Sequence, residues 1–130
     1  MARGGLDFEG IAAVYATFQA DGSVSSVALA SGVAAVEGKA VTITGNGIAG
    51  FGTAGKPVLG RIDKYEGDGY MTVQTGGYAK LPGVPGSLPT AGDFLVVDGN
   101  GAVTASAGAV GPARAISVNS TSNTVMVLIG

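Results

Sequence analysis

Hydrophobic and polar positions alternate over short stretches of this chain, and glycine or proline residues separate one stretch from the next. The clearest case is residues 92–107, GDFLVVDGNGAVTASA, where two apolar or β-branched segments flank the sequence DGNG at residues 98–101. Asp-Gly and Asn-Gly pairs tolerate the positive φ angles of tight hairpin turns. The pattern therefore predicts two strands joined by a tight turn.

A second hairpin is predicted near residue 130, where residues 113–118 and 124–129 flank a polar segment. In residues 125–129 the apolar side chains occupy both alternating faces, which is typical of a central, buried strand. Residues 45–55 are expected to form a glycine-rich loop, and Gly76-Gly77 are expected to interrupt a strand. The remaining strands are predicted at residues 33–36, 41–44, 57–64, 70–75 and 78–81.

Residues 11–20 fit two patterns. Ile11, Val14, Tyr15 and Phe18 have helical spacing, but Val14 and Phe18 also belong to an alternating series. Because Asp21-Gly22 follows directly and a second β-branched stretch comes after it, we expect a hairpin around Asp21-Gly22, with a helix over residues 11–20 as the alternative.

Eight or more short strands with glycine and proline turns predict an all-β fold. We expect a single-domain β-sandwich or β-barrel of short antiparallel strands over residues 11–130. Residues 1–10, MARGGLDFEG, are expected to form a flexible N-terminal arm.

Composition narrows the classes of function. The chain has 130 residues, no Cys and no His, so it has no disulfide, no thiolate metal site and no histidine general base. Charged residues make up 12%, about half the usual share, which indicates either a surface of small polar residues or a surface covered by partner protein.

The seven Lys and Arg are scattered and the net charge is −2, which argues against a nucleic-acid partner. No apolar run approaches the roughly 18 residues of a membrane span, and we expect no targeting segment and no membrane partner.

Three motifs suggest chemistry, and each has a structural explanation that we favour. Residues 45–50 (GNGIAG) match a dinucleotide-binding pattern, but no helix is predicted after them. Residues 50–56 (GFGTAGK) match part of a phosphate-binding loop, but Pro57 stands where Ser or Thr is needed. A cluster of Asp63, Glu66 and Asp68 could hold a cation or act in acid–base catalysis, although acidic residues beside glycines are typical of an exposed turn. We therefore predict no catalytic residue, no metal site and no cofactor.

The order of segments in the C-terminal part carries a resemblance. MTVQTGG and KLP are followed by AGDFLVVD, a glycine turn, GPARAI and a terminal VMVLI. This order resembles the small β-rich capsid decoration (cement) proteins of tailed bacteriophages. The resemblance covers about residues 41–130, and residues 1–40 fit it poorly.

The resemblance implies a structural protein without enzymatic activity, located on the exterior of the virion. Proteins of that group bind as symmetric oligomers at junctions between subunits of the major capsid protein and stabilise the expanded head. The implied partners are the major capsid protein and further copies of the same chain, with a trimer preferred and a dimer possible.

The candidate contact residues are large apolar side chains on segments with weak local patterning, and ordinary core packing is the alternative for each of them: Leu6, Phe8, Tyr15, Phe18 and Phe51. Two other classes of function stay open. One is a fibre- or tail-associated β module that recognises a cell-surface glycan through its tyrosines, and the other is a small enzyme that uses the Asp63, Glu66 and Asp68 cluster.

Overall fold

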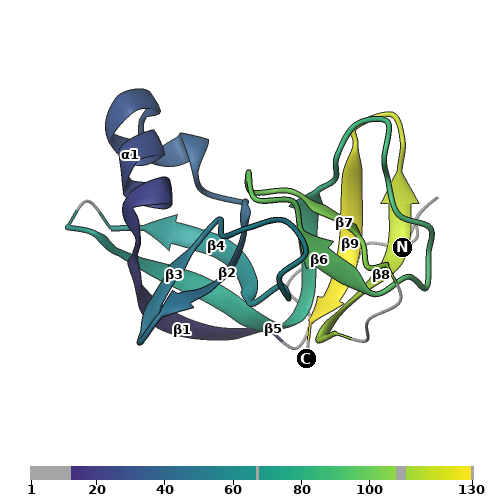
Figure 1. Cartoon of the computed structure of the whole chain (residues 1–130), viewed down its shortest axis with the longest axis horizontal. Helices are drawn as coiled ribbons and strands as arrows, with labels where there is room; N and C mark the ends of the chain where they lie inside the picture. The colour runs from purple at the N-terminus through teal and green to yellow at the C-terminus, as the bar shows by residue number, and fades with distance from the viewer. Residues whose placement is uncertain (1–12, 67, 108–110, 130) are drawn as a thin grey trace.

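The computed structural model describes residues 13–66, 68–107 and 111–129, and Figure 1 shows that strands dominate this part of the chain. The predicted all-β class is confirmed. One α-helix, α1 (Gly22–Ser31), and one short 3-10 helix, η1 (Val33–Ala35), occur among the described residues. The strands are β1 (Val14–Ala20), β2 (Ala40–Gly45), β3 (Ile48–Gly50), β4 (Gly60–Tyr65), β5 (Tyr70–Pro82), β6 (Leu95–Val97), β7 (Val103–Ala105), β8 (Ala113–Asn119) and β9 (Thr124–Ile129).

Five strands close into a barrel in the order β1-β3-β2-β4-β5, because β1 pairs with β5 as well as with β3. The β1–β3 pair is parallel and the other pairs are antiparallel. Gly60 lets β4 approach β5 closely, since a Cβ at this position would collide with the backbone carbonyl of Gln74. The barrel encloses a core formed by Ala20, Val24, Ala28, Val36, Val41, Ala49, Phe51, Ile62, Tyr65, Met71 and Val73.

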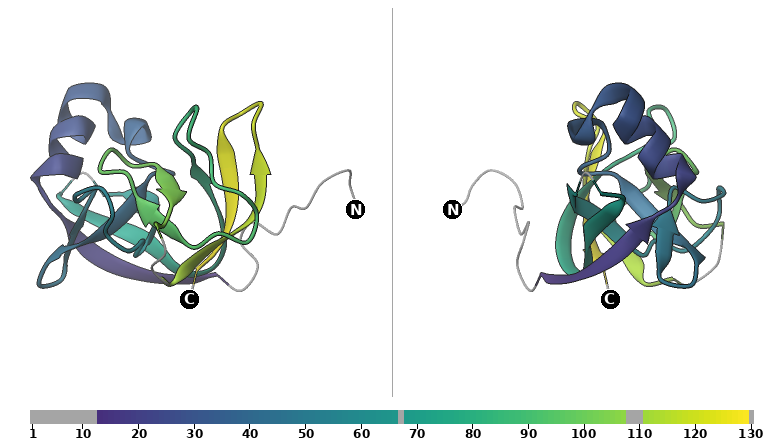
Figure 2. Two further views of the ribbon diagram at one scale, coloured as in Figure 1. Left: turned by 45° about the vertical axis from the view of Figure 1, so that its right-hand side comes forward. Right: turned by 90° about the vertical axis from the view of Figure 1, so that its left-hand side faces the viewer.

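The C-terminal half surrounds a core of its own beside the barrel (Figures 1 and 2). Strands β9 and β8 extend the sheet beyond β5, and β6 and β7 form a separate antiparallel pair. Isolated bridges join Phe94 to Arg114 on β8 and Gly83, just after β5, to Val103 on β7. The β6–β7 pair therefore packs on the face of the β5-β9-β8 sheet that carries the second core. The second core consists of Ala40, Val58, Ala79, Leu81, Leu95, Val97, Val103, Ala113, Ala115, Val125, Val127 and Ile129.

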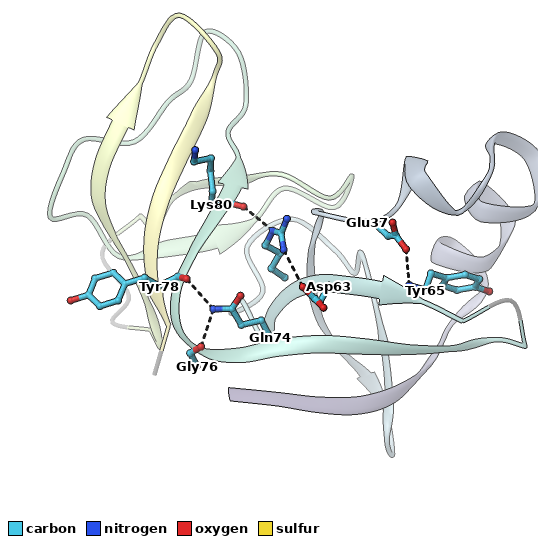
Figure 3. Close-up of polar contacts among 8 residues, drawn as sticks. Glu37, Asp63, Tyr65, Gln74, Gly76, Tyr78 and Lys80 are labelled. Carbon is cyan, nitrogen blue, oxygen red and sulfur yellow. Dashed lines mark hydrogen bonds and ion pairs between the residues drawn. The ribbon is translucent and has the colours of Figure 1, made fainter. Parts of the chain in front are cut away.

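Strand β5 belongs to both halves and bends where it passes from one to the other. It pairs with β1 up to Gly76 and with β9 from Gly77 onward. The Gln74 side chain is 2% exposed, and its Nε2 donates hydrogen bonds to the carbonyl oxygens of Gly76 (3.1 Å) and Tyr78 (3.0 Å), as Figure 3 shows. This one amide satisfies two carbonyls at the bend, where the regular ladder changes partner.

The hairpin expected around Asp21-Gly22 is wrong. Residues 14–20 form a strand, as the favoured interpretation required, but α1 begins at Gly22. Asp21 has extended backbone and its carboxylate accepts hydrogen bonds from the N–H groups of Ser23 and Val24, which is the geometry of a helix N-cap. Val24 and Ala28, four residues apart, pack into the barrel core, and this packing outweighs the low helix propensity of the segment. Figure 2 shows α1 at one end of the barrel.

Three further predictions are corrected. Residues 33–36 are not a strand, because η1 occupies residues 33–35. The glycine-rich segment 45–55 contains β3, which continues from β2 through a tight turn at Gly47. Gly76 and Gly77 do not interrupt the strand but allow β5 to bend within it.

Both C-terminal hairpins are confirmed. β6 pairs with β7 around a turn in which Gly99 and Gly101 have φ angles of 92° and 96°, and β8 pairs with β9. β9 lies between β5 and β8, as its two apolar faces predict. The predicted arm at residues 1–10 lies outside the described residues.

Candidate protein-contact surfaces

The described residues contain no constellation suited to metal binding. No three acidic side chains are arranged to hold an ion within residues 13–66, 68–107 and 111–129. Asp63 lies 3.6 Å from the Nη1 atom of Arg61, and Asp68 Oδ1 accepts a hydrogen bond from the N–H of Tyr70 at 3.1 Å. Asp63 thus lies on β4, and only Glu66 and Asp68 belong to the connection between β4 and β5. None of the helices in the described ranges has the length and apolar character needed to cross a membrane.

The five candidate contact residues do not come together on one surface. Phe51 is 7% exposed and belongs to the barrel core, so its ring is not available as a surface contact. Phe18 is partly buried against the same core. Tyr15 is 49% exposed and faces outward on β1, directly opposite Gln74. Leu6 and Phe8 lie outside the described residues.

A more prominent apolar surface lies where α1 passes into η1. Residues 29–34, which we call the helical tip, are all exposed, and Leu29 and Val33 are 90% and 43% exposed. No charged residue occurs between Asp21 and Glu37. Figure 1 shows α1 projecting from the barrel on the side away from β8 and β9. The helical tip is therefore an uncharged, largely apolar protrusion at one end of the molecule.

The residues on either side of the helical tip are anchored in the barrel. Val24 and Val36 are fully buried on either side of the helical tip, and Gly32 ends α1 with its N–H donating to the Ala28 carbonyl at 2.9 Å. Gly32 has a φ of 93°, which lets the chain reverse at once into η1. The exposed side chains thus extend from a short, anchored corner.

Asp21 connects α1 to the strands below it. Its Oδ1 accepts hydrogen bonds from Ser23 Oγ (2.6 Å) and Ser23 N (2.9 Å), and its Oδ2 accepts one from Thr44 Oγ1 on β2 (2.9 Å). Ser23 Oγ in turn accepts the N–H of Phe51 (3.1 Å). Burial raises the pKa of Asp21, but the hydrogen bonds from Ser23, Thr44 and Val24 outweigh burial and hold the pKa below its ordinary value. A Cβ at Gly50 would overlap this carboxylate, so glycine is needed beside it.

Two adjoining hollows lie beside the C-terminal part of β5. A hollow of about 570 Å³ beside the β8–β9 connection adjoins a second hollow of about 280 Å³ beside Lys39 and Arg61, and Lys80 and Thr124 line both. Arg61 Nε donates to the backbone carbonyl of Lys80 at 3.1 Å (Figure 3), so the side chain of Arg61 spans the junction between the two halves. We call these two hollows together the β5 groove. It carries three of the seven cationic side chains of the chain.

Leu29, Val33 and the residues of the β5 groove are not among the contact residues predicted from the sequence. The signal for the helical tip is present in the sequence as an uncharged run that begins at a capping aspartate, Asp21. The groove has no local signal, because its cations come from β4, β5 and the segment before β2, which only the fold brings together.

Comparison of the sequence with protein-family models finds no match, and comparison with curated proteins finds none either.

Proposed function

We propose that this chain is a capsid decoration (cement) protein that binds the outer surface of an assembled phage head at junctions between major capsid subunits and stabilises it. It acts as a homo-oligomer, with a trimer preferred, and works by binding alone, without catalysis. Its location is the exterior of the virion. The resemblance of residues 41–130 to decoration proteins supports the identity of the partner, and the surface of the molecule supports a contact between proteins.

The observation that carries the proposal is the exposure of the helical tip. Leu29 is 90% exposed, and the surrounding residues 29–34 are exposed and uncharged. Apolar surface gathered at a protruding point is typical of a site that another protein covers. Burying one leucine side chain contributes about 1.5–3 kcal/mol, which is roughly a factor of 10 to 150 in affinity for each bound copy.

The way the helical tip is held supports the same proposal. Binding is weakened by the entropy lost when mobile groups become ordered. Here Asp21, Val24 and Val36 fix the base of the helical tip before any partner binds. A capsid offers many identical sites, and an oligomer that engages several of them gains avidity from each further contact.

A sedimentation experiment tests the proposal. The purified protein is mixed with undecorated heads assembled from the cognate major capsid protein, and the heads are pelleted over a range of salt concentrations. We expect saturable binding at a fixed number of copies per capsomer and a higher melting temperature of the heads. Absence of co-sedimentation under every salt condition, or specific binding to a glycan array, would overturn the proposal.

A further inference from the structure

The connection between β4 and β5 carries two carboxylates beside an exposed aromatic ring. Glu66 and Asp68 precede Tyr70, and the Tyr70 side chain is 47% exposed. Asp68 Oδ1 accepts the N–H of Tyr70 at 3.1 Å, and Glu66 N donates to the Tyr70 carbonyl at 2.7 Å. We call these three residues the acidic turn. Tyrosine side chains that become buried in protein interfaces often dominate the binding energy, and here the exposed Tyr70 follows two carboxylates in the chain.

The β5 groove has the opposite charge. Lys39, Arg61 and Lys80 line it, and Glu37 is the one acidic side chain among the described residues that do so. Glu37 Oε2 already accepts the N–H of Tyr65 at 3.2 Å. The ammonium groups of Lys39 and Lys80 make no hydrogen bond or ion pair in the described part of the chain. Asp63 lies 3.6 Å from Arg61 Nη1 and offsets that cation, so the positive charge of the groove resides mainly on Lys39 and Lys80.

The acidic turn cannot fill the groove of its own chain. β4 carries the backbone away from the groove between Arg61 and Tyr65, a distance of about 13 Å at roughly 3.3 Å per residue. Figure 1 shows the end of β4 and the start of β5 on the far side of the barrel from β8 and β9. The two complementary surfaces therefore face different directions on one molecule.

We propose that the acidic turn of one copy binds in the β5 groove of a second copy of this chain. Glu66 and Asp68 approach Lys39 and Lys80, and the ring of Tyr70 packs against Pro82 at the wall of the groove. Because donor and acceptor surfaces differ, the contact runs head to tail and closes into a ring or continues as an open chain. This contact specifies how the copies of the proposed homo-oligomer associate. It rests on the proposed function only for the expectation that copies of the chain associate.

The ion pairs and the Tyr70 ring contribute to the proposed contact in different ways. Each exposed ion pair contributes a factor of about two to five in affinity and is screened by salt. Charge therefore selects the partner surface and the register, while burial of the Tyr70 ring supplies much of the remaining affinity. Self-association should weaken at high salt without disappearing.

Sedimentation velocity on the full chain tests the contact by reversal of charge. The wild-type protein should associate as its concentration is raised toward about 1 mM. K39E/K80E and E66K/D68K should each sediment as monomers over the same range. The quadruple variant K39E/K80E/E66K/D68K, in which both surfaces are reversed, should associate again. Tyr70→Ser should weaken association by about tenfold.

The controls separate this contact from general effects of charge. Lys56→Glu makes the same kind of change at an exposed loop position outside the groove and should leave association unchanged. Circular dichroism establishes that each variant is folded. A wild-type protein that stays monomeric, a folded quadruple variant that does not associate, or an equal effect of Lys56→Glu would each overturn the proposal.

Binding to heads distinguishes failure of this inference from failure of the proposed function. K39E/K80E keeps the helical tip, so it should still bind heads, with lower avidity. Self-association that follows the charges, combined with no binding to heads, would contradict the capsid proposal alone. Normal binding to heads by a protein that never self-associates would contradict the head-to-tail contact alone.

Discussion

Asp21 determines how α1, and with it the helical tip, is attached to the barrel. Its carboxylate accepts hydrogen bonds from the backbone of α1 and from Thr44 on β2. Replacing Asp21 by alanine removes all of these contacts at once. Replacing it by asparagine keeps an oxygen that can cap the helix but removes the charge.

The size of the effect follows from these contacts. Loss of an N-cap costs about 0.5–2 kcal/mol, and loss of a hydrogen bond to a charged group costs about 1.5–3 kcal/mol. Because the Thr44 hydroxyl is exposed and can bind water instead, the lower part of the second range applies. We expect Asp21→Ala to lower the free energy of unfolding by about 2–4 kcal/mol and Asp21→Asn by about 1 kcal/mol, since Asn caps helices nearly as well as Asp.

Urea denaturation followed by circular dichroism measures these losses. With a slope near 2 kcal/mol per molar urea, Asp21→Ala should move the midpoint by about 1–2 M. The folded-state pKa of Asp21 lies below its unfolded value. Its contribution to stability is therefore fully present above the unfolded pKa, about 3.9, and is lost as the pH falls through the folded pKa.

The pH dependence gives the sharper test. The difference in stability between the wild type and Asp21→Asn should be constant from pH 7 to about pH 5 and should shrink below about pH 4. A difference that stays unchanged down to pH 2.5 would refute the role assigned to the charge. A loss below 0.5 kcal/mol for Asp21→Ala, the usual scatter of surface substitutions, would refute the role of the whole cluster.

Three further substitutions test other parts of the structure. Gln74→Leu leaves the carbonyls of Gly76 and Tyr78 without their donor and should cost about 2–4 kcal/mol of unfolding free energy, measured in urea. Gly60→Ala places a Cβ against the backbone of β5 and should lower the melting temperature by more than Gly22→Ala, where the space beside the glycine is open and the backbone is helical. Leu29→Asp should leave the melting temperature unchanged, because the side chain is 90% exposed, but should weaken binding to heads at least tenfold.

The parts of the fold that the sequence predicts correctly depend on local chemistry. The DGNG turn and the alternating strands around it specify β6 and β7, and apolar residues on both faces place β9 inside the sheet. These features need only a turn type and a period, both of which can be read from neighbouring residues.

The predictions from the sequence are wrong where contacts between distant residues determine the local structure. α1 has serine and valine in its first two turns, which are weak helix formers, yet Asp21 caps the helix and the barrel end buries Val24 and Ala28. β5 looks interrupted at Gly76-Gly77, but Gln74 and pairing with β9 keep it continuous. Phe51 is predicted as a contact residue on a glycine-rich loop, but it directly follows β3 and packs in the barrel core.

The candidate contact surfaces are less predictable still. The exposure of Leu29 depends on a corner that exists only because α1 forms, and the β5 groove joins cations separated widely along the chain. Tyr15 is the one predicted contact residue among those described that lies half exposed on the outside of the barrel.

Electron cryomicroscopy of heads saturated with this protein would show where the protein binds and which surface contacts the capsid. We expect the protein to lie over junctions between major capsid subunits, with residues 29–34 buried against the capsid surface. Heads that carry no added density would contradict the proposed function. A protein bound with α1 pointing into solvent would contradict the role assigned to the helical tip.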